Sequence, residues 1–201
     1  MRYGMAIDLK RCIGCQACTM ACKAENGTPP GVFFTRVLEH EEGQYPKIAK
    51  TFVPVLCNHC KDAPCEKVCP TRATYRTPEG IVLVDHDKCI GCRYCYVACP
   101  YNNRFFLTNG VLTKGYYGVL TPYEKLKYAQ YQDGTIIKCT FCQHRLQKGR
   151  QPACVETCVT GARVFGDLDD PASEVRELIR VRRGYQPMAE LGTDPSVFYL
   201  D

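Results

Sequence analysis

Cysteine is the residue type whose number and spacing in this chain could organise chemistry. Sixteen of the 201 residues are cysteines, far more than an ordinary globular domain contains. Because four thiolates are a common ligand set for a protein-bound metal centre, their grouping predicts four such centres. The four groups leave no cysteine over: Cys12, Cys15, Cys18 and Cys22; Cys57, Cys60, Cys65 and Cys69; Cys89, Cys92, Cys95 and Cys99; and Cys139, Cys142, Cys154 and Cys158.

The first and third groups share the spacing Cys-x2-Cys-x2-Cys-x3-Cys, which fits the bacterial ferredoxin pattern. In that pattern three closely spaced thiolates hold one [4Fe-4S] cluster, and the fourth crosses to another. Gly14 and Gly91 allow tight turns in these groups, so that amide N–H groups can point at cluster sulfur. Zinc is usually bound by two separated pairs of ligands, so this spacing indicates iron–sulfur clusters.

The second and fourth groups are looser, with spacings of Cys-x2-Cys-x4-Cys-x3-Cys and Cys-x2-Cys-x11-Cys-x3-Cys. Either group alone would suit zinc. Each is, however, the partner of a ferredoxin-type group, and sixteen thiols accommodate four cubes with no ligand missing. We therefore predict four [4Fe-4S] clusters, with mixed iron–sulfur and zinc sites or a disulfide framework as alternatives. Disulfides are disfavoured because residues 1–10 carry no apolar stretch typical of an export signal.

The chain contains two internal repeats. Residues 6–15 match residues 83–92, which relates the first cysteine group to the third, and residues 65–73 match residues 154–162, which relates the second to the fourth. This pattern indicates an ancient duplication. Only 19 residues separate Cys69 from Cys89, an interval typical of ferredoxins. We therefore expect the second and third groups to form an inner pair, with the first and fourth groups as the outer pair.

This pairing predicts how the thiols divide among the clusters, because the fourth cysteine of a ferredoxin group crosses to the neighbouring cluster. The four predicted ligand sets are Cys12, Cys15 and Cys18 with Cys158; Cys139, Cys142 and Cys154 with Cys22; Cys57, Cys60 and Cys65 with Cys99; and Cys89, Cys92 and Cys95 with Cys69.

Short elements must position these groups. Residues 80–85 form an apolar, β-branched run that predicts a strand leading into the third group, with residues 5–8 as its counterpart. The x3 spacings allow single helical turns, which Pro70 and Pro100 prevent from continuing.

A helix is predicted near the C-terminus. Asp170 is expected to cap it, with Pro171 at its first position. Its spacing directs three apolar residues inward, namely Val175, Leu178 and Ile179.

The predicted fold class is α+β: two nested ferredoxin-like [4Fe-4S] modules with long loops and a C-terminal helix and tail. The outer module is expected to comprise residues 1–50 and 110–201, and the inner module residues 51–109. Residues 23–56 and 100–138 are expected to be long connections. The second contains a tyrosine-rich insertion at residues 101–137, predicted to be a buried insertion or a contact surface: Tyr101, Tyr116, Tyr117, Tyr123, Tyr128 and Tyr131.

Several functions are disfavoured by what the sequence lacks. No run of 18 apolar residues is present, which argues against a membrane span. No nucleophile–base arrangement, phosphate loop or dinucleotide-binding fingerprint indicates work on a substrate. The formal charge of +5 would favour binding to nucleic acid. Four anionic clusters outweigh this positive charge, so nucleic-acid binding is disfavoured.

Four charged or titratable residues lie within or beside the cysteine loops. His59 and His144 are candidates for tuning cluster potentials, with packing or capping as the commoner alternative. Lys61 and Arg93 would favour reduced clusters, or they are ordinary solvated side chains.

Five motifs carry a family resemblance: Cys57-Asn-His-Cys60-Lys-Asp-Ala-Pro-Cys65, Cys69-Pro-Thr, Lys138-Cys-Thr-Phe-Cys142-Gln-His-Arg145, Pro152-Ala-Cys154-Val and Gly166-Asp-Leu-Asp-Asp-Pro171. Together they resemble the four-cluster electron-transfer subunit of molybdopterin oxidoreductases. The likeness looks closest to the polysulfide, thiosulfate and respiratory arsenate reductase branch, with dimethyl sulfoxide reductase more distant. It supports the nested ligand assignment.

The resemblance implies partners and a location. It implies a catalytic subunit with molybdenum or tungsten bound by two pterin guanine dinucleotides, and often a membrane subunit that exchanges electrons with quinones. It also implies the extracytoplasmic face of the membrane, reached with a partner exported by a twin-arginine signal; a cytoplasmic location is the alternative.

Two positions depart from the family pattern without removing a ligand: Val159 replaces a proline, and Arg72 replaces a glycine. In family members where a tryptophan replaces one thiolate, a cluster changes type. Here that position is cysteine and the chain has no tryptophan, so all four clusters should be cubes.

We therefore predict a non-catalytic subunit that relays single electrons through four clusters, with no direct substrate and no nucleic acid. A polyferredoxin-type subunit of a hydrogenase or formate-oxidising complex is the alternative within electron transfer. A zinc-stabilised binding module is the alternative from another class.

Overall fold

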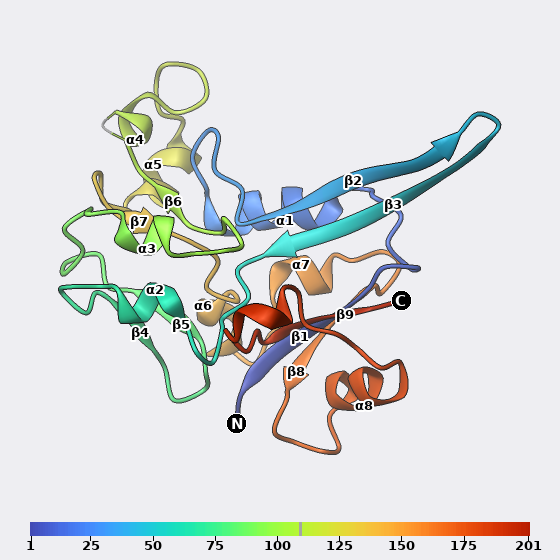
Figure 1. Cartoon of the computed structure of the whole chain (residues 1–201). Helices are drawn as coiled ribbons and strands as arrows, with labels where there is room; N and C mark the ends of the chain where they lie inside the picture. Colours follow the sequence, from blue (N-terminus) through green and yellow to red (C-terminus); the bar gives the residue numbers. More distant parts are fainter. Residues whose placement is uncertain (109) are drawn as a thin grey trace.

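The computed structural model describes residues 1–108 and 110–201. A three-stranded sheet places the first and last strands of the chain side by side (Figure 1). Its central strand pairs antiparallel with one neighbour and parallel with the other. The strand order is β8 (Arg163–Asp167), β1 (Tyr3–Asp8) and β9 (Val197–Leu200).

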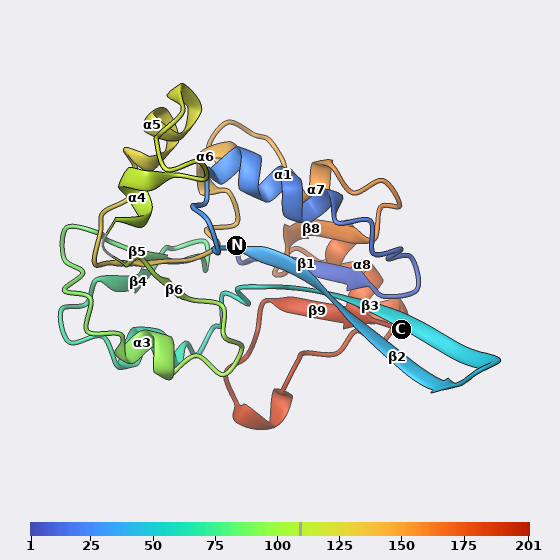
Figure 2. The same ribbon diagram turned by 90° about the horizontal axis from the view of Figure 1, so that it is seen from above.

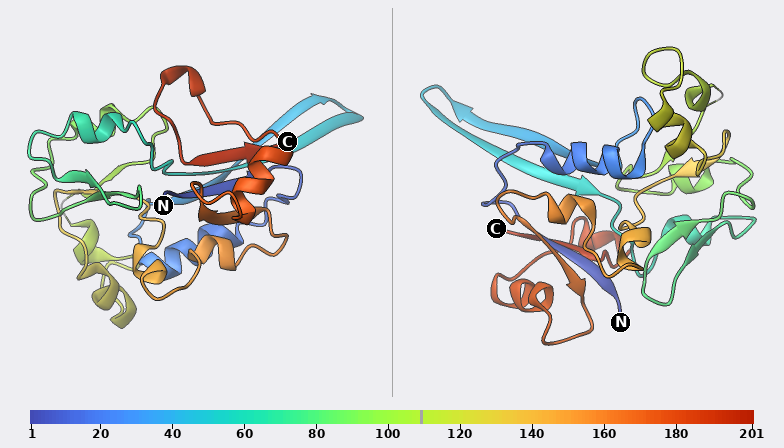
Figure 3. Two further views of the ribbon diagram at one scale, coloured as in Figure 1. Left: turned by 90° about the horizontal axis from the view of Figure 1, so that it is seen from below. Right: turned by 180° about the vertical axis from the view of Figure 1, so that it is seen from behind.

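Strand β1 is buried on both faces. Successive side chains of a strand point in opposite directions, and those of β1 pack into two different clusters. Met5 and Ile7 face the main core, whereas Ala6 packs with Leu168 and Val175 on the other side. Two helices cover the first face and one covers the second (Figure 3): α1 (Ala17–Asn26), α7 (Ala153–Glu156) and α8 (Glu174–Val181). The sheet is thus held between the cysteine-rich core and the C-terminal helix.

A two-stranded sheet, β4 (Thr74–Arg76) with β5 (Val82–Val84), repeats the β8–β1 pair. Arg163 lies opposite Ile7, and Thr74 lies opposite Val84 at the equivalent register. The next hydrogen bond is also the same in both strand pairs. Asp8 N–H donates to the Ala162 carbonyl and Asp85 N–H donates to the Ala73 carbonyl, each at 2.8 Å. The predicted strands are confirmed, and the duplication inferred from sequence is visible in the backbone.

Short helices follow the cysteine loops, as the x3 spacings predict. Three are single turns that end two residues before the last cysteine of their group: α2 (Pro64–Lys67), α3 (Tyr94–Val97) and α7. Helix α1 instead runs for 10 residues and ends at Gly27, which adopts a φ of 57°. Pro70 and Pro100 follow the cysteines after α2 and α3, whereas α7 is equally short although Val159 follows Cys158, so proline accounts for only two of the three short helices.

A long β-hairpin projects from the body of the molecule (Figure 2). It consists of β2 (Thr35–Gln44) and β3 (Lys47–Leu56), paired from Thr35 with Leu56 to Gln44 with Lys47. The long connection expected over residues 23–56 is therefore built largely from this hairpin. Only the base of the hairpin is buried, so backbone pairing rather than a buried apolar face extends it, and its outer half shows no strong strand pattern in sequence.

The tyrosine-rich insertion folds over the end of α1. It contains α4 (Val111–Lys114) and α5 (Pro122–Tyr128), and is closed at its base by β6 (Phe105–Phe106) and β7 (Ile136–Ile137). The Tyr131 hydroxyl donates to the Asn26 carbonyl at 2.7 Å. Tyr128 is buried, whereas Tyr117 is 82% exposed, so the segment has both an inward and an outward face.

The C-terminal helix begins later than predicted. Ser173 is its cap, accepting a hydrogen bond from Arg176 N–H, while Asp170 accepts one from Ala172 N–H in the turn before it. The Asp170 cap is therefore wrong, because the side chain closes a turn instead of starting the helix. The inward face is confirmed, with Val175 buried and two neighbours packed beside it, Leu178 and Ile179.

Two further short elements complete the fold, α6 (Gln143–Leu146) in the fourth cysteine group and a 3-10 helix, η1 (Ala189–Leu191), in the tail. The tail then crosses to the second cysteine group, where the Asp194 carbonyl accepts a hydrogen bond from Lys61 N–H at 2.8 Å. No helix in the described part of the chain is long and apolar enough to cross a membrane.

Candidate metal centres

All sixteen cysteines are free thiols; seven are buried, seven are half-buried and two are exposed. Four of them belong to the main hydrophobic core: Cys18, Cys22, Cys139 and Cys154. Among residues 1–108 and 110–201, no three His, Cys, Asp or Glu side chains converge tightly enough to hold a single metal ion. Thiolates around a cube each bind a different iron atom, and therefore stand further apart than the ligands of one ion.

Thiols of the first and fourth groups lie together. Burial is the main cause that raises the pKa of Cys12, and the nearby Cys18 and Cys158 raise it further. Burial likewise raises the pKa of Cys22, to which Cys154 and Cys142 add. Cys158 is thus a neighbour of the first group, and Cys22 a neighbour of the fourth.

Thiols of the second and third groups are neighbours in the same way. Burial raises the pKa of Cys60 to about 12, with contributions from Cys57, Cys65 and Cys99.

The pKa of Cys95 is raised mainly by burial. Cys89 and Cys69 raise it further, against the opposing effect of Arg104. Cys99 of the third group therefore neighbours the second, and Cys69 of the second neighbours the third.

Cys15 and Cys92 are the two exposed thiols, at equivalent positions of the repeat. Each is held by the loop that also positions the cysteines on either side of it.

The two ferredoxin-type loops have one backbone conformation. Gly14 and Gly91 have φ values of 69° and 67°, and Gln16 and Arg93 follow at 60° and 62°. A Cβ on Gly14 would lie 2.3 Å from the Phe52 ring, and one on Gly91 would lie 2.1 Å from the Gly134 carbonyl oxygen. The predicted tight turns are confirmed, and both glycines are required by conformation and by space.

Cys69 and Cys158 are the two thiols whose pKa is lowered. Burial alone would raise each pKa, but backbone N–H groups of the following turn outweigh it. Thr74 N–H lies 3.4 Å from the Cys69 sulfur, and the Thr71 and Thr160 hydroxyls lie 3.8 Å from the Cys69 and Cys158 sulfurs. These turns stabilise a thiolate, the form that binds iron.

The departure at Arg72 leaves that turn intact. Arg72 has a φ of 55°, and the equivalent Gly161 has a φ of 61°. The arginine therefore adopts the left-handed conformation that glycine supplies in the repeat.

Three buried cations lie among the thiols, and sequence reasoning missed them: Arg104, Lys138 and Arg163. Burial lowers the pKa of Arg104, but Cys65, Cys95 and Cys57 together outweigh it, so the net pKa is raised. Within residues 1–108 and 110–201, Nε and one terminal nitrogen of Arg104 have no hydrogen-bond partner. Buried donors and positive charge beside thiols fit anionic clusters, which would supply the missing acceptors.

Arg163 is positioned by the same kind of environment. Burial lowers its pKa, and Cys154, Cys18 and Cys158 outweigh that effect and raise it. Lys138 donates to the backbone carbonyls of Val82 and Cys139. The signal that could have found these cations is their position, because Lys138 directly precedes a ligand and Arg163 directly follows a repeated motif.

The two histidines differ. His59 is 1% exposed and its Nδ1 accepts a hydrogen bond from Val82 N–H at 3.1 Å. Burial, then Lys138 and Arg104, lowers the pKa of His59, so the ring is neutral. His144 instead pairs with the Glu25 carboxylate at 2.7 Å on the surface.

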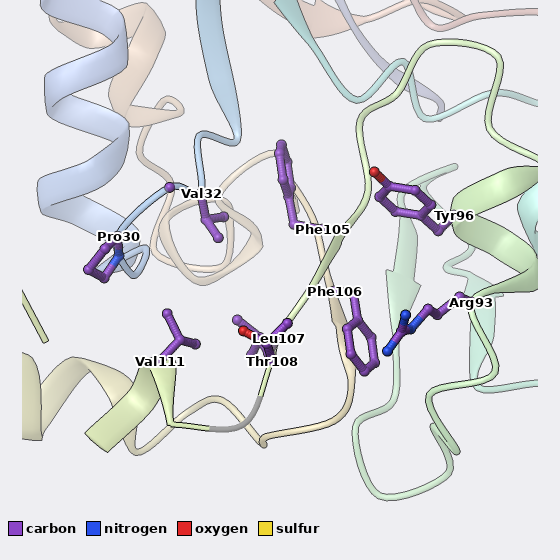
Figure 4. A pocket seen from close by; sticks show the side chains of 10 residues that line it. Pro30, Val32, Arg93, Tyr96, Phe105, Phe106, Leu107, Thr108 and Val111 are labelled. Carbon is purple, nitrogen blue, oxygen red and sulfur yellow. The ribbon is translucent and has the colours of Figure 1, made fainter. Parts of the chain in front are cut away.

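Arg93 and Lys61, the two cations in the cysteine loops, contact other side chains at the surface. Arg93 lies over the Phe106 ring, 3.8 Å from its centroid, beside a hollow of about 420 Å³ (Figure 4). Lys61 is 3.9 Å from the Asp194 carboxylate.

Family comparisons agree with this arrangement. One family model, described as a 4Fe-4S dicluster domain, matches residues 48–114 and 116–168, and a second of the same description matches residues 11–73. The arsenate respiratory reductase iron-sulfur subunit ArrB of Shewanella sp. strain ANA-3 is 43% identical over 100% of this chain and 96% of its own.

Two other relatives are similar over nearly the whole chain. A selenate reductase subunit of Mesobacillus selenatarsenatis is 45% identical over 100% of this chain and 72% of its own length. A tetrathionate reductase subunit of Salmonella typhimurium is 43% identical over 99% of this chain and 72% of its own.

The chain belongs to this family of iron–sulfur subunits. It is an iron–sulfur electron-transfer subunit of the molybdopterin oxidoreductase family, and its sixteen cysteines serve four [4Fe-4S] clusters. The resemblance noted from the motifs is confirmed, and the zinc-stabilised alternative is not needed.

Proposed function

We propose that this subunit conducts single electrons through its four clusters between a molybdopterin catalytic subunit and a membrane subunit that reacts with quinones. It does no substrate chemistry itself. The observation that supports the proposal is that the fourth cysteine of each group lies near thiols of another group. Each bound cluster supplies one-electron redox chemistry, and the protein sets its position and surroundings.

The proposed ligand sets are those expected from the spacings. Cys158 beside Cys12 and Cys22 beside Cys154 support the outer sets, and Cys99 beside Cys60 and Cys69 beside Cys95 support the inner ones. The sets are Cys12, Cys15, Cys18 and Cys158; Cys139, Cys142, Cys154 and Cys22; Cys57, Cys60, Cys65 and Cys99; and Cys89, Cys92, Cys95 and Cys69.

Two nested modules hold these sets in the proposal. Strands β4 and β5 join the second and third cysteine groups, and strands β8 and β1 join the fourth and first. The inner module would comprise residues 51–109, and the outer module residues 1–50 and 110–201.

The modules would meet at one junction. Burial raises the pKa of Cys139, and Cys22 and Cys57 raise it further, so a thiol of the outer pair neighbours one of the inner pair. The exposed Cys15 and Cys92 belong to the other two sets. The order of the relay would therefore run from the Cys15 set through the two sets at the junction to the Cys92 set.

The chain's own residues would exclude water from this path and stabilise the sulfur ligands. Phe141 and Leu56 are 1% exposed beside the junction, and the Phe141 N–H donates to the Cys139 sulfur at 3.4 Å. The Asn26 amide donates to Cys22 sulfur at 3.4 Å. Such bonds ease the negative charge of bound thiolates.

We also propose the extracytoplasmic face of the membrane, reached with a catalytic partner exported by the twin-arginine route. Cell fractionation tests this location. Recovery of the iron-loaded subunit with the extracytoplasmic fraction supports it, and recovery with the cytoplasm supports the alternative.

The relay is tested on the purified complex. About sixteen iron atoms per chain are expected, with a molybdenum or tungsten subunit and a quinone-reactive subunit in the same preparation. Electrons supplied through the catalytic subunit should reduce all four clusters, and a quinone should reoxidise them. A hydrogenase large subunit in that preparation would favour the polyferredoxin alternative, and an iron-free compact chain would contradict both.

Serine variants test the crossing of ligands. The electron paramagnetic resonance signal lost in Cys158→Ser should match the one lost in Cys12→Ser, not the one lost in Cys154→Ser. In the inner pair, Cys69→Ser should match Cys92→Ser, not Cys60→Ser. The opposite matches would show that each group holds its own cluster without exchange.

A further inference from the structure

Each pair of cysteine groups encloses one buried arginine. Arg104 is 1% exposed, and a terminal nitrogen donates to the Thr74 hydroxyl at 3.1 Å. Arg163 is 3% exposed, and a terminal nitrogen donates to the Thr35 hydroxyl at 2.9 Å. The two contacts lie in different halves of the molecule, but they are chemically the same.

The arginine–threonine contact uses the equivalent position of the repeat for different partners in the two halves. Thr74 and Arg163 occupy equivalent positions, opposite Val84 and Ile7 in the two repeated strand pairs. That position supplies the hydroxyl in one half and the guanidinium in the other. The duplicated sequence therefore does not explain the contact, whereas a need for one cation in each half does.

Neither arginine is neutralised by a carboxylate in the described part of the chain. Among residues 1–108 and 110–201, the remaining contact of Arg163 is to the Met5 sulfur at 3.8 Å, and two nitrogens of Arg104 have no partner. A buried cation without a counter-charge is strongly unfavourable. The groups that can compensate it are cysteine sulfurs that become thiolates when they bind iron: Cys65 and Cys95 beside Arg104, and Cys154 and Cys18 beside Arg163.

Those thiolates come from two ligand sets in each case. Cys65 and Cys95 belong to the two inner sets, and Cys154 and Cys18 belong to the two outer sets. We propose that Arg104 is a cation shared by the two inner clusters and Arg163 one shared by the two outer clusters, each raising both reduction potentials beside it. The assignment of clusters to pairs rests on the ligand sets of the proposed function.

The physical reason is electrostatic. Reduction adds one electron, and so one negative charge, to a cluster, while the arginine stays protonated and no proton moves. A fixed positive charge in a poorly screened interior stabilises the more negative, reduced form. Because the cation lies near thiols of both ligand sets, it raises both potentials together and leaves the difference between them nearly unchanged.

The test is a redox titration of the iron-loaded full chain, followed by electron paramagnetic resonance. Arg104→Gln should lower the potentials of both inner clusters by at least about 59 mV, a tenfold change in the one-electron reduction equilibrium, and leave the outer pair unmoved. Arg163→Gln should do the reverse. Arg104→Lys and Arg163→Lys keep the charge and should restore most of each shift.

Arg180→Gln is the matched control, because it removes one positive charge from the exposed face of α8, where Arg180 pairs with Glu177. It should move no potential. Unmoved potentials in an assembled Arg104→Gln chain, or a shift confined to one inner cluster, would overturn the shared role.

The remaining outcomes also decide. Loss of iron from the glutamine variants of both arginines would overturn the proposal by showing a structural role. If only one glutamine variant keeps its iron, the potentials of the two clusters beside that arginine decide whether the proposal holds. A variant that shifts one inner and one outer cluster would contradict the ligand sets instead, so failure of the proposed function and failure of the tuning role can be told apart.

Discussion

The imidazole of His59 stacks on the phenyl ring of Phe141, with ring centroids 3.8 Å apart and an angle of 28° between planes. His59 lies between Cys57 and Cys60, and Phe141 lies between Cys139 and Cys142. The stack therefore joins the second cysteine group to the fourth at the proposed junction of the two modules. Because His59 is neutral there, the contact is one of packing and not of charge.

Truncation of this stack should weaken the junction. Phe141→Ala removes a ring that is 1% exposed and leaves a cavity, which typically costs about 3–5 kcal/mol. We expect the visible absorption of the clusters to be lost at a lower temperature, with Phe141→Leu close to the parent. Tyr117→Ala, at an 82% exposed ring, is the control. An unchanged transition in Phe141→Ala would contradict a packing role at the junction.

Serine at one exposed ligand should damage one pair of clusters selectively. Cys92→Ser is expected to remove or convert one inner cluster and leave the outer pair nearly unchanged. Cys15→Ser, at the equivalent position of the repeat, is expected to do the opposite. Iron content and electron paramagnetic resonance of the folded chain measure both. Equal weakening of all four signals in either variant would argue against two separate modules.

The sequence predicted the parts of this molecule that local chemistry dictates. The cysteine spacings predicted the turns at Gly14 and Gly91, and the apolar run predicted β5. The β2–β3 hairpin could not be predicted, because backbone pairing extends it without a buried face. Arg104 and Arg163 were missed because a position near a cysteine motif does not by itself show that an arginine is buried; only the folded chain brings thiols from two groups around each.

Alanine at Gly91 should disrupt the third cysteine group. The position has a φ of 67°, which costs a non-glycine residue about 1–2 kcal/mol, and the new Cβ would lie 2.1 Å from the Gly134 carbonyl oxygen. Gly134→Ala is the matched control, since its φ is 77° but no atom lies within 4 Å of a new Cβ. We expect iron loss in Gly91→Ala only. Equal iron loss in both would mean that conformation, and not space, is limiting.

Glu25 should contribute to stability above acidic pH. It accepts hydrogen bonds from Arg145 at 2.6 Å and His144 at 2.7 Å, and although burial opposes them, they lower its pKa below the ordinary 4.5. A lowered folded pKa gives stabilisation that is present above the unfolded pKa and lost as the pH falls through the folded value. Glu25→Gln should therefore lower stability by about 2 kcal/mol from about pH 8 to about pH 5.5.

The check is thermal denaturation of parent and variant under anaerobic conditions across about pH 8 to 4. The difference between them should be flat at first and shrink only below about pH 4.5, where the parent's carboxylate begins to be protonated. A difference that already changes above about pH 5.5 would contradict Glu25 as the titrating group.

Removal of iron should unfold much of the chain. Cys18, Cys22, Cys139 and Cys154 lie within the main hydrophobic core, together with Phe141 and Ile7. Without the clusters, this core holds buried thiols and uncompensated arginines in place of bonded sulfur, so its packing loses support. Chelation under anaerobic conditions should expand the hydrodynamic radius and weaken the far-ultraviolet circular dichroism, and both should recover when iron and sulfide are restored. An iron-free chain that stays compact and melts cooperatively would show that hydrocarbon packing alone holds the fold.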